Sequence, residues 1–141
     1  MLIKLYDSQK VRVTNSEILY KILRDIHFSQ DKFDTEKEFF YCVMLNRMND
    51  IRFIDIVSIG NLTGTVVSVR EIFRHAIVKG AYSVVIAHNH PSGNTSPSDA
   101  DRQVVKQIAE AGKIIGIRVM DSLIITEKSY YSFSDEGMMD Y

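Results

Sequence analysis

The spacing of hydrophobic residues along the chain changes between helical and strand-like, which predicts an α/β domain. Apolar residues recur three and four positions apart in Asn15–His27, after the capping-box pattern Thr14-Asn15-Ser16-Glu17, and predict a first helix. The continuous apolar and aromatic run Glu38–Leu45 predicts a strand buried on both faces. Turn-forming residues at Asn46–Asp50 then make Ile51–Ile59 the returning strand of a hairpin.

A break and a second helix follow this hairpin. Gly60-Asn61-Leu62-Thr63-Gly64 interrupts the strand pattern. A second capping box, Ser68-Val69-Arg70-Glu71, opens a helix that should end near Gly80. The short apolar run Ser83–His88 predicts a central strand, and the turn-rich stretch Asn89–Pro97 ends it.

The last third of the chain predicts one more helix and the remaining strands of the core. The helix should cover Ser98–Ala111 and close at Gly112. Core strands are predicted at Ile114–Met120 and Leu123–Thr126, with an edge strand at Tyr130–Phe133. The order α-β-β-α-β-α-β-β predicts an α/β fold with a mixed sheet flanked by helices.

Composition narrows the class of protein. The 141 residues fit a single domain, with residues 1–36 as a helical lead-in and residues 37–141 as the core. Because no apolar run approaches the roughly 18 residues of a membrane helix and the N-terminus does not have a signal-peptide pattern, we expect a cytoplasmic protein with no membrane partner. A net charge of −1 does not favour direct nucleic-acid binding. The single cysteine, Cys42, excludes a disulfide framework and a cysteine-rich zinc site, and it is predicted to be a buried hydrophobic residue.

The chemistry-bearing segment is HNHPSGNTSPSDAD, from His88 to Asp101. Residues two apart on a strand point to the same face, so His88 and His90 can present two imidazoles to one point. Pro91 and Gly93 end the strand in a turn. The turn returns the chain to a helix whose first residues include Ser98 and Asp101.

Two histidines and one aspartate supply three ligands and leave a fourth position for water, which is the pattern of a catalytic zinc site. Zinc lowers the pKa of water to about 7. Each residue also has a purely structural interpretation. Ser98 and Asp101 form a Ser-x-x-Asp helix cap, and His88 and His90 can be polar residues leaving a strand end.

The motif H-x-H-P-x6-S-x2-D resembles the metal motif of the JAB/MPN (JAMM) metalloproteases, and the fuller string is similar to the RadC family. The resemblance extends to EFFYCVMLN, VSIG, VREIF and the segment around Asp121. It implies a cytidine deaminase-like architecture with one zinc ion per chain. By this resemblance His88, His90 and Asp101 match the zinc ligands, and Ser98 matches the serine that assists the reacting oxygen.

The family also places a glutamate at the start of an upstream strand that begins Glu-Phe, and Glu38 matches it. Its role there would be to take a proton from the attacking water and deliver it to the leaving amine. From the residues alone, Glu38 can equally be a solvated residue at a strand start, and Glu36 and Glu71 are rivals.

These matches predict a zinc-dependent hydrolase that cleaves an amide bond in a peptide or isopeptide substrate. The alternative is a DNA-repair-associated or DNA-maintenance module that acts by binding partners. A zinc deaminase needs H-x-E with P-C-x-x-C, which one cysteine cannot supply. The string His88-Asn89-His90 matches the HNH nucleases only in spelling, because their motif is dispersed.

The sequence departs from the family in two places. Many RadC proteins have Asp-His where this chain has Asp121-Ser122. Longer members carry an N-terminal region of helix-hairpin-helix character, so any DNA-binding role of that region is not carried over to residues 1–36. Edge strands would allow a homodimer, but no interface pattern specifies one.

Overall fold

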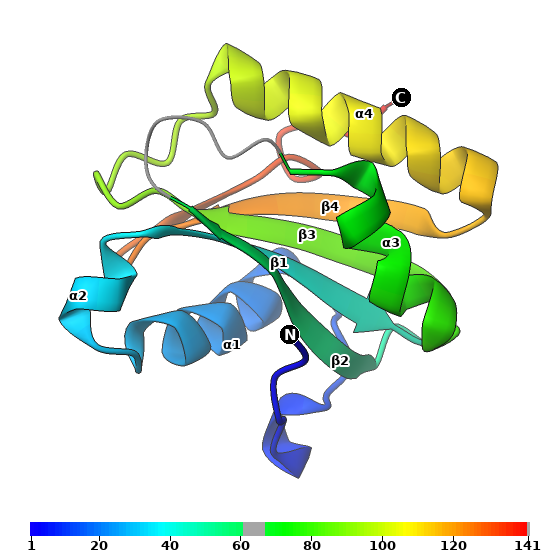
Figure 1. Ribbon diagram of the computed structural model, residues 1–141, viewed down its shortest axis with the longest axis horizontal. Helices are drawn as coiled ribbons and strands as arrows, with labels where there is room; N and C mark the ends of the chain where they lie inside the picture. Colours follow the sequence, from blue (N-terminus) through cyan, green and yellow to red (C-terminus); the bar gives the residue numbers. More distant parts are fainter. Residues whose placement is uncertain (61–66, 141) are drawn as a thin grey trace.

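A five-stranded mixed sheet forms the centre of the protein, shown in Figure 1 as a computed structural model that describes residues 1–60 and 67–140. The strands lie in the order β2-β1-β3-β4-β5, and every neighbouring pair is antiparallel except β3 and β4. This confirms the predicted α/β class with a mixed sheet. The strands are β1 (Glu38–Leu45), β2 (Ile51–Gly60), β3 (Ser83–Asn89), β4 (Arg118–Ile125) and β5 (Tyr130–Ser132).

Helices cover both faces of the sheet (Figure 1). One face carries α3 and α4 and the other carries α1, while a short 3-10 helix, η1, lies near the N-terminus. Sequence reasoning missed α2, a single turn in the polar stretch before β1. Within the described ranges, no helix is both long and apolar enough to cross a membrane. The helices are η1 (Asp7–Gln9), α1 (Ser16–Phe28), α2 (Lys32–Thr35), α3 (Val69–Val78) and α4 (Asp99–Ile115).

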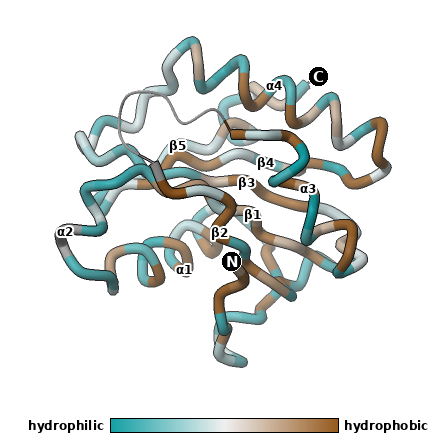
Figure 2. The backbone as a smooth tube through the Cα atoms, viewed as in Figure 1, coloured by the Kyte–Doolittle hydropathy of each residue, from teal (hydrophilic) through white to brown (hydrophobic). Residues whose placement is uncertain are grey.

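The alternation of side chains along β1 and β3 builds two hydrophobic cores, one on each face of the sheet. On β1, Phe40 and Cys42 pack toward α3 and α4, whereas Phe39 and Tyr41 pack toward α1. Figure 2 shows hydrophobic stretches, in brown, along the central strands. Cys42 is fully buried, as predicted, and its burial, together with the charge of Asp55, raises the pKa of its thiol to about 12.

Two of the predicted helix starts differ in detail from the structure. The cap of α1 is Asn15, whose side chain accepts a hydrogen bond from the Ile18 amide, and not Thr14. Ser68 does precede α3, but its side chain makes no capping hydrogen bond. Glu71, expected to complete that box, instead forms an ion pair with Arg74. The residue patterns therefore located both helices without giving the right cap chemistry.

The boundary between α4 and β4 was predicted wrongly. The helix runs through Gly112 and ends at Gly116, which has the left-handed φ of 86°. A Cβ at Gly112 would lie 2.5 Å from the Ile117 carbonyl oxygen, so this glycine permits a close approach and does not end the helix. What was predicted as two strands is one, β4, which passes through Asp121 because Ser132 and backbone amides satisfy that carboxylate.

The predicted break at Gly60-Asn61-Leu62-Thr63-Gly64 lies outside the described residues, apart from Gly60 at the end of β2. The hairpin turn at Asn46–Asp50 is confirmed, with Asn49 at a positive φ of 65°.

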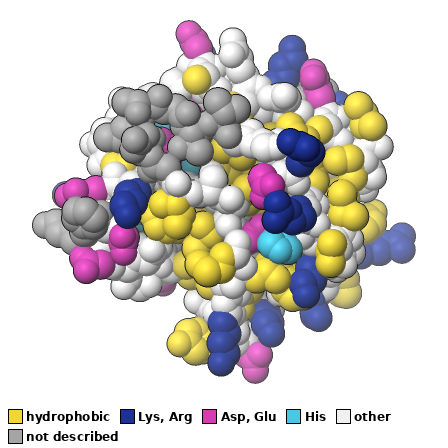
Figure 3. Space-filling model, in the orientation of Figure 1, with side chains coloured by type: hydrophobic (Ala, Val, Ile, Leu, Met, Phe, Trp, Pro, Cys, Tyr) yellow, Lys and Arg dark blue, Asp and Glu magenta, His cyan; other side chains and the backbone are white. Residues whose placement is uncertain are grey.

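The face that carries α3 and β2 mixes basic, acidic and hydrophobic side chains (Figure 3).

Candidate metal centre

Two histidines meet where the central strand ends. His88 lies on β3 directly opposite Phe40 of β1, and His90 follows two residues later on the same face of the sheet. The His88 side chain is 4% exposed, and the His90 side chain is 18% exposed. The His90 amide donates to the Ile125 carbonyl, so pairing with β4 continues past the end of the strand. The pleat of one strand therefore points both imidazoles toward α4.

A tight turn after the strand fixes the orientation of His90. The Gly93 amide donates to the His90 carbonyl at 3.0 Å, with Pro91 in the first central position and Gly93 at a φ of 84°. The turn brings the Asn94 carbonyl to within 2.7 Å of His90 Nδ1. Because a carbonyl oxygen only accepts, Nδ1 must donate, and the Nε2 of a neutral ring is left as the free ligand atom.

The start of α4 supplies the carboxylate. Ser98 is the N-cap, and its Oγ accepts from the Asp101 amide at 3.0 Å. Asp101 Oδ2 accepts in return from the Ser98 amide at 2.8 Å, which completes a reciprocal capping box. The cap confirms the structural interpretation of these two residues. It also aims Asp101 at the two histidines.

Three side chains converge on one point. His88 Nε2 lies 3.2 Å from Asp101 Oδ1, and His90 Nε2 lies 3.2 Å from Asp101 Oδ2. The two Nε2 atoms are also 3.2 Å apart. Zinc bonds of about 2.0–2.1 Å in a tetrahedral site space the ligand atoms about 3.3–3.4 Å from one another. Each histidine lies near this spacing from one of the two Asp101 oxygens. Among the described residues, these three side chains form the one group of three or more His, Cys, Asp or Glu that is placed to hold a metal ion.

The cluster is electrostatically coupled. Burial acts to raise the pKa of Asp101, but hydrogen bonds from His88 and His90 outweigh it and hold that pKa well below its ordinary value. The hydrogen bond to Asp101 raises the pKa of His90 against the opposing effect of burial, and the charges of Asp101 and Glu38 act in the same direction. This site favours a cation between the rings and the carboxylate, whether a proton or a metal ion.

Glu38 is the first residue of β1 and is half-buried. Two-residue periodicity puts it on the same face as Phe40, which stacks on His88, and its charge acts on His90. The fold thus brings Glu38 to the histidine end of the sheet across fifty residues of sequence. Of its rivals, Glu36 is exposed in the segment before β1, and Glu71 is paired with Arg74 on α3.

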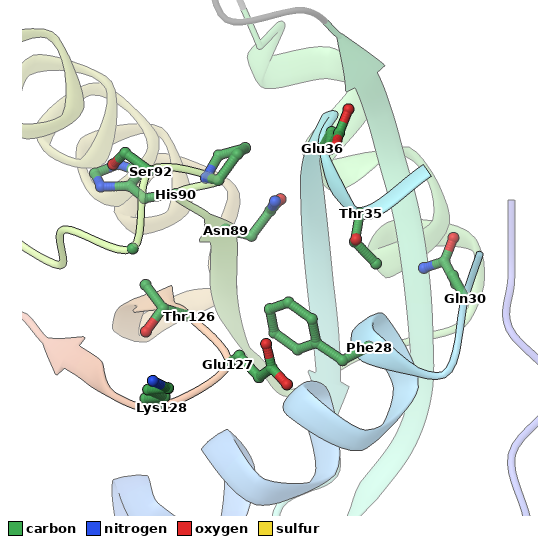
Figure 4. A pocket seen from close by; sticks show the side chains of 12 residues that line it. Phe28, Gln30, Thr35, Glu36, Asn89, His90, Ser92, Thr126, Glu127 and Lys128 are labelled. Carbon is green, nitrogen blue, oxygen red and sulfur yellow. The ribbon is translucent and has the colours of Figure 1, made fainter. Parts of the chain in front are cut away.

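Sequence reasoning missed the surroundings of this centre. Asn89 points to the opposite face from its histidine neighbours, a direction that strand periodicity could have given. It also lines a pocket of about 710 Å³, and His90 belongs to both the pocket and the ligand cluster (Figure 4). The pocket is lined by Phe28, Gln30, Thr35, Glu36, Asn89, His90, Pro91, Ser92, Gly93, Thr126, Glu127 and Lys128.

The mixed sheet, the helices on both faces and the His-His-Asp cluster at the end of β3 define a JAB-type domain. A family model described as a RadC-like JAB domain matches residues 13–138. The chain belongs to this RadC-like family.

Its relatives include proteins of several bacteria. It is similar to the UPF0758 protein STH371 of Symbiobacterium thermophilum, at 40% identity over 72% of this chain and 44% of the relative. It is also similar to UPF0758 proteins of Flavobacterium johnsoniae, at 38% over 90% of this chain and 53% of the relative, and of Rubrobacter xylanophilus, at 45% over 74% and 45%. The chain spans about half the length of these curated relatives.

Proposed function

We propose that this protein is a zinc-dependent hydrolase of the JAMM type that cleaves an amide bond in a peptide or isopeptide substrate. The observation that carries the proposal is the geometry of the cluster: His88 Nε2 and His90 Nε2 lie 3.2 Å apart, and each lies 3.2 Å from one of the two Asp101 carboxylate oxygens. Two imidazoles and a carboxylate are a zinc donor set, and three protein ligands leave a fourth position for water or substrate. When bound, zinc polarises a carbonyl group and lowers the pKa of water.

Glu38 is assigned to proton transfer. Its place on the histidine face of β1 supports this assignment, as does the effect of its charge on His90. The carboxylate takes a proton from the water whose oxygen forms the new bond to the carbonyl carbon. It then gives that proton to the amide nitrogen as the carbon–nitrogen bond breaks.

Ser98 is assigned to the carbonyl oxygen of the substrate. Its Oγ accepts from the Asp101 amide, which uses a lone pair and leaves the hydroxyl proton free to be donated. Donation to an oxygen that gains negative charge stabilises the transition state more than the ground state. Capping and catalysis are therefore compatible in this residue.

The pocket beside His90 is assigned to the substrate. Its volume of about 710 Å³ is typical of ligand sites. It opens between the end of α1 and the turn after β4, and Phe28 gives it an apolar surface (Figure 4). A peptide held there would reach the ligand cluster past the His90 ring.

The test begins with metal analysis of protein purified without chelator, where one zinc per chain is expected. Zinc-loaded protein is then assayed against peptide and isopeptide libraries. Glu38→Gln should keep zinc and lose hydrolysis by roughly 10²–10⁴-fold, whereas His88→Ala should weaken zinc binding itself. Glu71→Gln is the matched control, because it removes a carboxylate on α3 and should change neither property.

Two results would overturn the proposal. The first is fully zinc-loaded protein that hydrolyses none of the library substrates. The second is a Glu38→Gln variant with undiminished turnover. Salt-dependent binding of duplex DNA by the isolated chain, without hydrolysis, would instead support a DNA-maintenance module.

A further inference from the structure

Asn89 stands between the two histidines but faces the other side of the sheet. It is 1% exposed, and both ends of its amide are bonded to the segment at the start of β1. Its Oδ1 accepts from the Phe39 amide at 2.6 Å. Its Nδ2 donates to the Lys37 carbonyl at 2.9 Å. The side chain therefore holds the backbone on both sides of a single residue, Glu38.

This arrangement extends the sheet where the paired strands end. The register of β1 with β3 ends at Phe40 opposite His88, and beyond it the Asn89 amide takes the place of a strand peptide group. On the other edge, Glu38 is paired with Gly60 of β2. Because the peptide groups on both sides of Glu38 are fixed, its Cα–Cβ bond has one direction, toward the histidine face.

We propose that Asn89 is a positioning residue that acts through Glu38, an inference that rests on the proposed hydrolytic role of that carboxylate. Asn89 fixes the point from which the Glu38 side chain leaves the backbone, and so sets the distance between the carboxylate and the metal centre. The residue couples two strands that differ in their contribution. β3 and the residue that follows it supply the two histidine ligands, and β1 supplies the proposed proton carrier, Glu38.

The chemistry of the amide explains why asparagine fits here. The start of β1 presents one N–H donor and one C=O acceptor toward Asn89. A short side chain with a primary amide can bond to both, because its oxygen accepts and its nitrogen donates. An aspartate would accept from Phe39 but place a carboxylate against the Lys37 carbonyl. An alanine would remove the acceptor of the buried Phe39 amide and the donor to the Lys37 carbonyl.

The same strand supplies a matched control. Asn46, just past the far end of β1, accepts from the Met48 and Asp50 amides and so holds the hairpin turn. Asn46→Ala and Asn89→Ala should both lower the thermal unfolding temperature. Asn46, however, lies at the opposite end of β1 from Glu38. Both variants are prepared as zinc-loaded protein, together with Glu38→Gln and the double variant Asn89→Ala/Glu38→Gln.

Three measurements that need no substrate are made first. Zinc affinity is measured by competition with a chromophoric chelator. Exchange of the Phe39 amide and the side-chain rotamers of Glu38 are measured by NMR. In Asn89→Ala we expect unchanged zinc affinity, faster Phe39 exchange and several Glu38 rotamers in place of one. In Asn46→Ala all three should match the wild type.

Turnover gives the fourth measurement. In Asn89→Ala, kcat should fall roughly 10- to 100-fold, and by more than any change in KM that comes from the pocket that Asn89 also lines. The same substitution in the Glu38→Gln background should change kcat by no more than about twofold, because the group that it positions is already gone. If Asn89→Ala does not fold, Asn89→Asp replaces it in the zinc, rotamer and turnover measurements, because it keeps the bond from Phe39 and loses only the bond to the Lys37 carbonyl.

Each contrary result overturns the proposal for a different reason. Zinc affinity that falls together with kcat would mean that Asn89 acts on the histidines. A single Glu38 rotamer in Asn89→Ala would mean that Asn89 does not act through Glu38. The same conclusion would follow if Asn89→Ala lowered kcat as much in the Glu38→Gln background as in the wild type. If the wild type hydrolyses nothing, the proposed function fails, while the zinc and NMR measurements still decide whether Asn89 positions Glu38.

Discussion

The ring of Phe40 lies parallel to the imidazole of His88, with the centroids 5.7 Å apart and the planes within 1° of each other. The two residues are directly opposed across β1 and β3. His88 Nδ1 is buried, and in the part of the chain that the structure describes it has no hydrogen-bond partner. Packing against Phe40 therefore orients this ligand, whereas His90 is oriented by a carbonyl.

Phe40→Leu should weaken zinc binding by about 10-fold, because the His88 ring would lose the surface that fixes its plane. The smaller side chain should also lower the free energy of unfolding by about 1–3 kcal/mol. The control is Phe39→Leu on the opposite face, which should cost similar stability and leave zinc affinity unchanged. Metal titration and denaturant unfolding measure the two effects. Equal zinc affinities in the two variants would contradict this role.

Gly93→Val should strain the turn after β3 and reduce zinc affinity, because L side chains rarely adopt its φ of 84°. Outside the two adjacent residues, no heavy atom lies within 4 Å of the added Cβ, so the cost is conformational. Gly116 at the end of α4 has a φ of 86° and equally open surroundings. Gly116→Val should therefore lower stability by a similar amount, about 1–2 kcal/mol, without changing zinc binding. If Gly93→Val left zinc affinity unchanged, the conformation of this turn would not be required for zinc binding.

The contribution of the ligand cluster to stability should depend on pH. The raised pKa of His90 gives metal-free protein stability that is present below its ordinary value of 6.5 and is lost as pH rises through the folded-state pKa. The lowered pKa of Asp101 gives stability that is present above its ordinary value of 3.8 and is lost as pH falls. The cluster should therefore stabilise metal-free protein most between these two values.

As pH rises through the pKa of His90, zinc affinity should increase, whereas the stability that the cluster gives metal-free protein decreases. Because zinc binds the unprotonated imidazole, its affinity should rise with pH through the pKa of His90. Thermal unfolding with and without zinc, from about pH 5 to about pH 8, measures both trends. Asp101→Asn should reduce the pH dependence of metal-free stability in this range, because the carboxylate that raises the pKa of His90 is removed. A zinc-induced shift of unfolding temperature that is constant over this range would be inconsistent with ligation by His90.

Gly112→Ala should destabilise the protein by about 1–3 kcal/mol, because the new methyl group would overlap the Ile117 carbonyl oxygen. The backbone after α4 would have to move. Gly112 is distant from the ligands, so zinc affinity measured by titration should stay the same. Denaturant unfolding that shows no loss of stability would mean that the α4–β4 connection can shift freely.

Ser98→Gly should separate the two roles of Ser98. Glycine is a tolerable N-cap that costs only a few tenths of a kcal/mol, and it keeps the backbone amide that donates to Asp101. Zinc affinity and unfolding temperature should therefore change little. Loss of the hydroxyl should lower kcat by about 10²–10³-fold if it donates to the reacting oxygen. Unchanged kcat would leave Ser98 with its capping role alone.

Strand periodicity and turn chemistry made the centre of this fold predictable from the sequence. Glu38–Leu45 was recognisable because nearly every residue in it is apolar, and His88 and His90 because a spacing of two must share a face. The α4–β4 boundary was not recognisable. In the sequence, Gly112 resembles the glycine that ends a helix. In the folded chain a glycine is needed there because the Ile117 carbonyl approaches it closely.

The site was predictable to the extent that its parts are local. The His88–Asp101 segment contains its own turn, cap and ligands, so spacing alone indicated the cluster. Asn89 was not predicted as an anchor because its partners lie fifty residues earlier, at the start of β1. Phe40 was foreseen as a core residue, but its contact with a ligand depends on the register between two strands.

The Asp101 carboxylate both closes the first turn of α4 and faces the histidines, so the helix and the metal centre share one group. Linkage makes this coupling reciprocal: the free energy by which metal binding stabilises the first turn equals the free energy by which the ordered turn favours metal binding. Ligand capture would stiffen the first turn of a seventeen-residue helix whose far end lies across the domain from the site. A contact made anywhere along α4 that slows fraying of that turn would, by the same linkage, raise affinity at the centre.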